Sequence, residues 1–175
     1  MKNLVFILCL SFNLLAATKK GTTIFVDLSP AGSFEAKSSK IKGGKVVKDN
    51  GKYTVENIYI PSDSIETGID LRDEHLRKRL GKEDVTVIKA EGKDGKGKGQ
   101  IKINGIVKDF DFTFEEIEKK YLKGKFKLKL SDFKITDISY MGIGVEDSII
   151  VEAIVKFSEK KSDKKESKIE NEVEK

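Results

Sequence analysis

The only histidine of the chain, His75, lies in the stretch "TGIDLRDEHLRKRL" (67–80), next to Arg72, Asp73 and Glu74. A histidine among carboxylates could serve as a general base or as a metal ligand. A base would need a nucleophile and an orienting carboxylate, but neighbouring residues on a helix point to different sides. A metal would have only carboxylates as further ligands. We therefore predict neither a catalytic site nor a metal site.

Of three roles for this segment, we predict a structural role, with contact to a ligand headgroup and catalysis as the alternatives. In that role His75, four residues after Leu71, packs and hydrogen-bonds at one end of the fold. Arg72 either pairs with Asp73 to fix the helix or meets the polar headgroup of a ligand, and Asp70 is predicted to cap the helix. The third role is catalysis on a lipid-like substrate by His75 and a carboxylate.

Residues 1–17 have the pattern of an export signal: a positive start, an apolar run from Leu4 to Leu15, and small residues at its end. We predict cleavage before Thr18 and a periplasmic location. A membrane anchor is the alternative, but the run is shorter than the roughly 20 residues that a spanning helix needs. Acylation at Cys9 is disfavoured by the bulky Leu8 before it.

The composition excludes several classes of function. Cys9 is the only cysteine, so the mature protein would have no disulfide, thiol nucleophile or cysteine metal site. The net charge is +5, but Lys and Arg are scattered among 29 acidic residues. This predicts no nucleic acid partner and favours transient contact with an anionic membrane surface. Residues 158–175 hold six lysines, six acids and two aliphatic residues, which predicts a disordered or loosely helical tail.

Between the signal and the tail, apolar and polar residues alternate with period two, which is typical of strands with one buried face. The clearest runs are "KDFDFTFEE", "KFKLKLSD" and "SIIVEAIVKF", and the weaker ones are "TTIFVDL", "SFEAKSSKI", "KYTVENIYI", "VTVIKAE" and "QIKINGIV". We predict turns at Asn50-Gly51, Gly92–Gly99, Asn104-Gly105 and Lys123-Gly124. The run "GKDGKGKG" lacks the ending of a phosphate-binding loop, so we predict a flexible hairpin loop.

About eight antiparallel strands must form a sandwich or a closed barrel to hide their edges, and the pattern alone does not choose between them. A barrel of this size holds either its own side chains or one small apolar ligand. The sequence has ten phenylalanines and no tryptophan, and phenylalanine is abundant among the residues predicted to point inward.

Three segments in order resemble the YceI-like family: "SIETGIDLRDEHLRKRL" (64–80) with its Arg-Asp and His-Leu pairs, "GQIKINGIVKDFDFTFE" (99–115), and "FKLKLSDFKITDISYMGIGVEDSIIVEAIVKF" (126–157). They follow the order of the family at plausible spacing, so the resemblance extends over nearly all of the domain between the signal and the tail. One departure is the stretch "GKEDVTVIKAEG", which lacks the proline that the family usually has before the next strand.

The resemblance implies an eight-stranded, antiparallel, lipocalin-like β-barrel over residues 18–157, with one short helix near 70–80, often dimeric and periplasmic. It implies binding of a polyisoprenoid, an isoprenoid quinone or a fatty amide, with no enzymatic activity and no cofactor. The candidate mouth or headgroup residues are Arg72, Asp73 and His75. A filled barrel that serves as a structural or interaction protein is the alternative. The predicted cavity lining comprises Ile101, Ile103, Phe110, Phe112, Phe114, Phe126, Leu128, Leu130, Val151 and Ala153.

Overall fold

The computed structural model describes residues 19–118, 120–140 and 142–160. The predicted signal peptide and residues 161–175 of the predicted tail lie outside them. The strands are β1 (Gly21–Ser29), β2 (Ser33–Ser38), β3 (Lys42–Asp49), β4 (Lys52–Ile60), β5 (Val85–Lys93), β6 (Lys96–Ile103), β7 (Ile106–Ile117), β8 (Tyr121–Lys129), β9 (Ser139–Tyr140), β10 (Ile143–Lys156) and β11 (Ser158–Glu159). The helix is α1 (Asp70–Leu80), and two 3₁₀ turns are η1 (Ser62–Ser64) and η2 (Ser131–Phe133).

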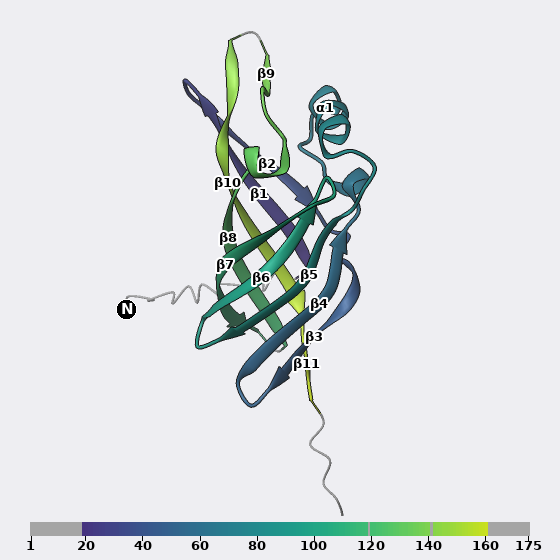
Figure 1. The fold of residues 1–175 in the computed structure, drawn as a ribbon, viewed down its shortest axis with the longest axis vertical. Helices are drawn as coiled ribbons and strands as arrows, with labels where there is room; N and C mark the ends of the chain where they lie inside the picture. Colours follow the sequence, from purple (N-terminus) through teal and green to yellow (C-terminus); the bar gives the residue numbers. More distant parts are fainter. Residues whose placement is uncertain (1–18, 119, 141, 161–175) are drawn as a thin grey trace, which may run out of the picture.

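One sheet, in the order β11-β3-β4-β5-β6-β7-β8-β10-β1-β2, curls into a half-barrel, with β9 paired to β10 (Figure 1). Its neighbours are antiparallel, except β11 and β3, which run parallel. The predicted all-β, lipocalin-like fold and the helix at 70–80 are confirmed. The predicted number of eight strands is wrong, because ten strands follow the path of the sheet in the described part of the chain.

The strand that the period-two pattern misses is β3. Its sequence begins with Lys42, Gly43 and Gly44, and two glycines weaken a strand pattern. Here they let the backbones of β3 and β4 come close, since a Cβ built on Gly44 would lie 1.6 Å from the carbonyl oxygen of Glu56. Two further strands that the sequence pattern does not predict, β9 and β11, are only two residues long. Strand β11 consists of the first two residues of the predicted tail.

Tight turns join the central hairpins. Asn50-Gly51, Asp94-Gly95 and Asn104-Gly105 all have positive φ, the backbone of a two-residue hairpin turn. The predicted flexible loop at Gly92–Gly99 is therefore only two residues long, and its other residues are paired in β5 and β6. The turn predicted at Lys123-Gly124 is wrong, since both residues lie inside β8 and pair with β10.

The segment between η1 and α1 covers the free edge of β2. Lys37 and Glu66 exchange backbone hydrogen bonds of 2.7 and 2.9 Å, and the hydroxyls of Ser38 and Ser64 lie 2.8 Å apart. These contacts hold α1 at the same end of the half-barrel as β9 (Figure 1). In the described part of the chain, no helix combines the length and the apolar character that crossing a bilayer requires.

Candidate apolar binding cavity

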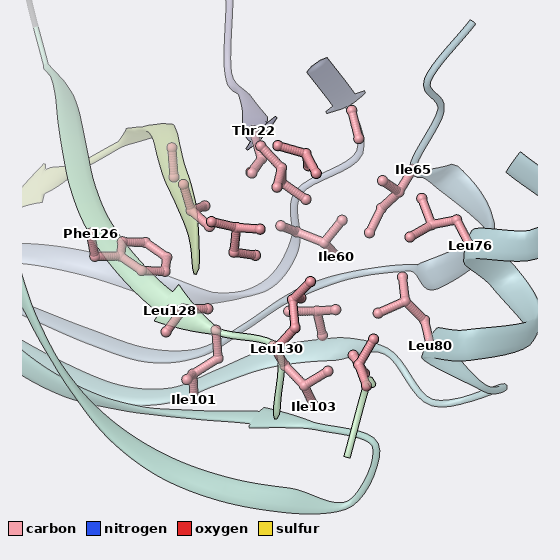
Figure 2. A pocket seen from close by; sticks show the side chains of 18 of the residues that line it. Thr22, Ile60, Ile65, Leu76, Leu80, Ile101, Ile103, Phe126, Leu128 and Leu130 are labelled. Atoms are coloured by element: carbon pink, nitrogen blue, oxygen red, sulfur yellow. The ribbon is translucent and has the colours of Figure 1, made fainter. Parts of the chain in front are cut away.

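The curled sheet encloses a cavity of about 830 Å³, near the upper end of the roughly 300–1,000 Å³ usual for small-molecule sites. Figure 2 shows Ile101 and Leu128, from the sheet, pointing into the same space as Leu76 and Leu80 of α1. The wall is built from apolar side chains of β1, β2, β4–β8 and β10. Such an interior attracts apolar molecules, because their transfer out of water is favourable.

All ten residues predicted to line an interior lie on the wall of this cavity. Their alternation along the strands places them on one face of the sheet, and the curl turns that face inward. Ile101, Ile103, Phe110, Leu128 and Val151 are buried, whereas the other five are partly exposed toward the cavity. Ligand binding by these residues stays a prediction.

The interior is hollow because three phenylalanine rings of β7 lie against glycines of neighbouring strands. A Cβ built on Gly97 would lie 2.3 Å from Cζ of Phe112, and one on Gly92 would lie 2.5 Å from Cε1 of Phe114. A Cβ built on Gly99 would lie 2.9 Å from Cε1 of Phe110. Rings that occupy the space of missing side chains lie along the wall and leave the centre free.

Aromatic packing closes the end of the cavity remote from α1. The ring of Tyr53 packs edge-on against Phe114 and Phe157, with centroids 5.2 and 5.3 Å apart. The hydroxyl of Tyr53 donates to the carboxylate of Glu116, which satisfies the polar end of this buried side chain. Leu122 completes the cluster. Phe157 thus lies in this cluster and not on the cavity wall.

The open end lies beside α1. Three apolar lining residues are unusually exposed: Ile69 (51%), Leu71 (56%) and Ile143 (48%). Ile69 and Leu71 belong to the start of α1 and Ile143 to the start of β10, which pairs there with β9. An apolar rim of this kind is expected where an apolar ligand enters, because the rim stays in contact with the ligand during entry.

Two of the three predicted mouth residues line the cavity, namely Arg72 and His75. The Arg72 guanidinium stacks on the ring of Phe34, 4.1 Å from the centroid. The predicted packing and hydrogen-bonding role of His75 is wrong: its side chain is exposed, and the side-chain hydrogen bonds of α1 within the described residues do not involve it. Among these residues, no group of three or more His, Cys, Asp or Glu side chains could hold a metal ion.

The third predicted mouth residue, Asp73, has a structural role. Its side chain is only 6% exposed, and its carboxylate accepts hydrogen bonds from the Thr67 hydroxyl (2.6 Å) and the Thr67 backbone N–H (2.7 Å). The pKa of Asp73 lies below its ordinary value, mainly because the Thr67 hydroxyl donates a hydrogen bond to the carboxylate. The positive charges of Arg77 and Arg72 also lower this pKa, whereas burial raises it. The cap predicted at Asp70 is wrong, because Ile69 is the N-cap and no side chain caps the helix.

We expect Asp73→Ala to lower the free energy of unfolding by about 1–3 kcal/mol at neutral pH, since it removes a buried charged acceptor of two hydrogen bonds. Because the pKa of Asp73 is lower in the folded state, its carboxylate stabilises the fold at pH values above 3.8, the ordinary pKa. This stabilisation is lost as the pH falls through the folded-state pKa. The difference between wild type and variant should therefore shrink below pH 3.8. Urea denaturation of wild type and Asp73→Ala at several pH values measures this difference in the free energy of unfolding.

Glu74→Ala is the matched control for Asp73→Ala. The carboxylate of Glu74 is exposed, and among the described residues it bonds only to Lys78 of the same helix, at 2.7 Å. Its loss should change stability little at any pH. Equal effects of the two substitutions would contradict the role that we give to the contact between Asp73 and Thr67.

Several lining residues were not predicted. Thr22, Ile24, Val26 and Leu28 of β1 all face the cavity. Their period-two spacing in "TTIFVDL" was a sufficient signal, because β1 lies between β10 and β2 on the inner face. Leu76 and Leu80 of α1 had no such signal, since the helix is mostly charged and only its position over the cavity brings them to the wall.

The molecule is an antiparallel, lipocalin-like half-barrel, and its one described helix lies beside the open end of an apolar cavity. The chain belongs to the YceI-like family, because the family model for the YceI-like domain matches residues 16–157. A comparison with curated proteins finds none that matches this chain.

Two solved structures share the fold. A polyisoprenoid binding domain from Saccharophagus degradans, implicated in plant cell wall breakdown, is 10% identical, with a TM-score of 0.53 over 77% of this chain and 91% of that domain. BcnA of Burkholderia cenocepacia is 11% identical, with a TM-score of 0.54 over 76% of this chain and 94% of BcnA. At such identities the likeness concerns the fold alone.

Proposed function

We propose that this protein binds one long apolar chain in its cavity and keeps it out of water, without a chemical step. A polyisoprenoid, an isoprenoid quinone or a fatty amide has the required shape. The observation that carries the proposal is the apolar cavity of about 830 Å³ that opens beside α1. The shared fold of one structural neighbour, a polyisoprenoid binding domain, supports it. Export to the periplasm, dimerisation and membrane contact stay predictions from the sequence.

Partition into the preformed cavity would supply the binding free energy. Each methylene group removed from water contributes about 0.8 kcal/mol, and association opposes binding by about 4–15 kcal/mol. A chain of several isoprene units therefore binds tightly, whereas a short chain does not. Affinity should therefore depend steeply on chain length.

The alternative of a filled barrel is disfavoured by the size of this space. Protein interiors are close-packed, and their voids are seldom larger than a water molecule. A space of about 830 Å³ lined by apolar side chains is far larger than such packing defects. The rings that lie over glycines on β5 and β6 show how the sheet maintains this space.

A chain-length series with the variant Gly124→Phe tests the proposed function. Gly124 lines the cavity between Phe114 of β7 and Ala153 of β10, and a Cβ built there has no heavy atom nearer than the Ala153 carbonyl oxygen at 4.0 Å. The Cβ of a phenylalanine there would meet no backbone clash, and its ring would shorten the closed end. We expect tenfold or greater loss of affinity for the longest chain that wild type accepts, since each excluded methylene is about a fourfold effect.

Shorter chains should bind Gly124→Phe as they bind wild type, with calorimetry as the measurement. Lys127→Phe is the matched control, because Lys127 lies on the same strand, is exposed and does not line the cavity. It should leave the whole series unchanged. The proposed function would be overturned if wild type bound no chain of any length.

A further inference from the structure

The hydroxyl of Thr22 is a polar group without a partner in the apolar wall of the cavity. Thr22 is 5% exposed, and among the described residues its Oγ1 is the only buried side-chain nitrogen or oxygen that makes no hydrogen bond. Its side chain lines the cavity, at the space that Ile60 and Ile65 also line (Figure 2). Because buried polar groups nearly always have a hydrogen-bond partner, an exception on the wall of a binding cavity points to a partner that the ligand supplies.

Thr22 lies away from the opening beside α1. The inward side chains of β1 run from Leu28, which pairs with Val145 near the open end, to Thr22 at the other end of the strand. The other polar lining residues of the described chain belong to α1, to the segment that leads into it, or to β9, except Tyr53. The hydroxyl of Tyr53 is already bonded to Glu116. Thr22 therefore offers a free hydrogen-bonding group where the rest of the described wall is apolar.

The nearest hydroxyl, that of Ser38, does not serve Thr22. Ser38 lies opposite Thr22 on β2, but its Oγ lies 2.8 Å from Oγ of Ser64 and accepts a 3.1 Å hydrogen bond from the backbone N–H of Lys40. The Ser64 hydroxyl donates to the Pro61 carbonyl oxygen at 2.7 Å, so Ser38 is the donor in the contact between the two serines. With its single proton used there, Ser38 cannot donate to Thr22.

Short side chains leave room beside the Thr22 hydroxyl. Thr22 pairs with Ala153 of β10, and Ala153 pairs with Gly124 of β8. All three residues line the cavity, and a Cβ built on Gly124 would have only the Ala153 carbonyl oxygen within 4.0 Å. A small polar group carried by an apolar chain therefore has space to approach Thr22 from inside the cavity.

We infer that Thr22 forms a polar subsite inside the cavity, and that the ligand carries a neutral oxygen, in a carbonyl or a hydroxyl group, on the part that reaches it. A threonine hydroxyl both donates and accepts, so it bonds to either group. An unbroken hydrocarbon chain would cover the hydroxyl without giving it a partner, which opposes binding. An ionised group does not suit the subsite, because the charged lining residues of the described chain all belong to α1. The inference rests on the proposed function, since the chain must occupy the cavity to reach Thr22.

Octadecane and its isomeric monoketones test the inference, because the series places one carbonyl oxygen at every depth of the same chain. Each ligand is delivered from cyclodextrin, and its dissociation constant is measured for wild type and Thr22→Val, which keeps the branched shape and removes the hydroxyl. We expect Thr22→Val to bind octadecane at least as tightly as wild type does. For the ketone whose oxygen reaches Thr22, the substitution should lower the ratio of ketone affinity to octadecane affinity about tenfold.

Two further variants complete the test. Thr22→Ser keeps the hydroxyl and should keep the wild-type ratios. Thr23→Val is the matched control, because Thr23 is the next residue of β1 and does not line the cavity, and it should leave every ratio unchanged. Ratios that Thr22→Val leaves unchanged for all ketones, with octadecane still bound, would overturn the inference and leave the proposed function standing. Failure of wild type to bind octadecane or any of the ketones would overturn the proposed function itself.

Discussion

Phe112→Arg should reduce the affinity for a long apolar chain at least about a hundredfold. Phe112 lies midway in the stack of Phe110, Phe112 and Phe114, with ring centroids 5.7 and 5.8 Å from its two neighbours, and its ring lines the cavity. An arginine there places a charge beside the bound chain. Its desolvation without a partner opposes binding by several kcal/mol, and about 2.7 kcal/mol already corresponds to the hundredfold loss.

The measurement is mass spectrometry of the organic extract from protein purified without detergent, followed by titration with the chain recovered from wild type. Thr113→Arg is the matched control, because Thr113 is the next residue of β7, is exposed, and points to the outer face. It should retain the chain. Since Phe112 is only partly buried, Phe112→Arg should stay folded, which circular dichroism checks. Wild-type affinity in a folded Phe112→Arg protein would show that the chain does not pass β7.

The largest expected loss of stability is that of Phe133→Ala, about 3–5 kcal/mol. Phe133 ends η2, is 1% exposed and packs in the main hydrophobic core, but it does not line the cavity. Its removal leaves a void that no ligand fills. Against a total stability of about 5–15 kcal/mol this loss is severe, and the melting temperature should fall by roughly 6–20 °C.

The position of Phe133 depends on the short turn around it. The backbone N–H and the hydroxyl of Ser131 donate to the two carboxylate oxygens of Asp147, at 2.7 and 2.8 Å. Val107→Ala is the matched control: Val107 is an apolar residue of β7 that is 45% exposed and does not line the cavity, so its truncation should change stability little. Equal melting temperatures for wild type and Phe133→Ala would contradict a role of η2 in the core.

The two substitutions separate cavity wall from core. Phe112→Arg is expected to change binding far more than stability, and Phe133→Ala is expected to change stability in the ligand-free protein. Both residues are phenylalanines, so side-chain type does not distinguish them. The difference lies in their surroundings, because one ring faces an open space and the other is enclosed on all sides.

Much of the fold was accessible from pattern alone. The alternation of Phe110, Phe112 and Phe114 with polar residues identified the inner face of β7, because the side-chain period of a strand is fixed by its geometry. The helix at 70–80 was placed correctly between two strand patterns. Strand β3 was missed because Gly43 and Gly44 interrupt its pattern, and only its pairing with β4 reveals it as a strand.

The inner face, the helix and the family resemblance were thus readable in the sequence, since they depend on local periodicity and short motifs. Whether the interior is filled or hollow was decided by tertiary structure. Gly92 and Gly97 come next to the rings of Phe114 and Phe112 only when β5, β6 and β7 pair in register, and this contact lays the rings along the wall. The separate roles of Arg72 and Asp73 have the same origin: adjacent residues of one helix face different surroundings, and those surroundings exist only once the sheet has curled.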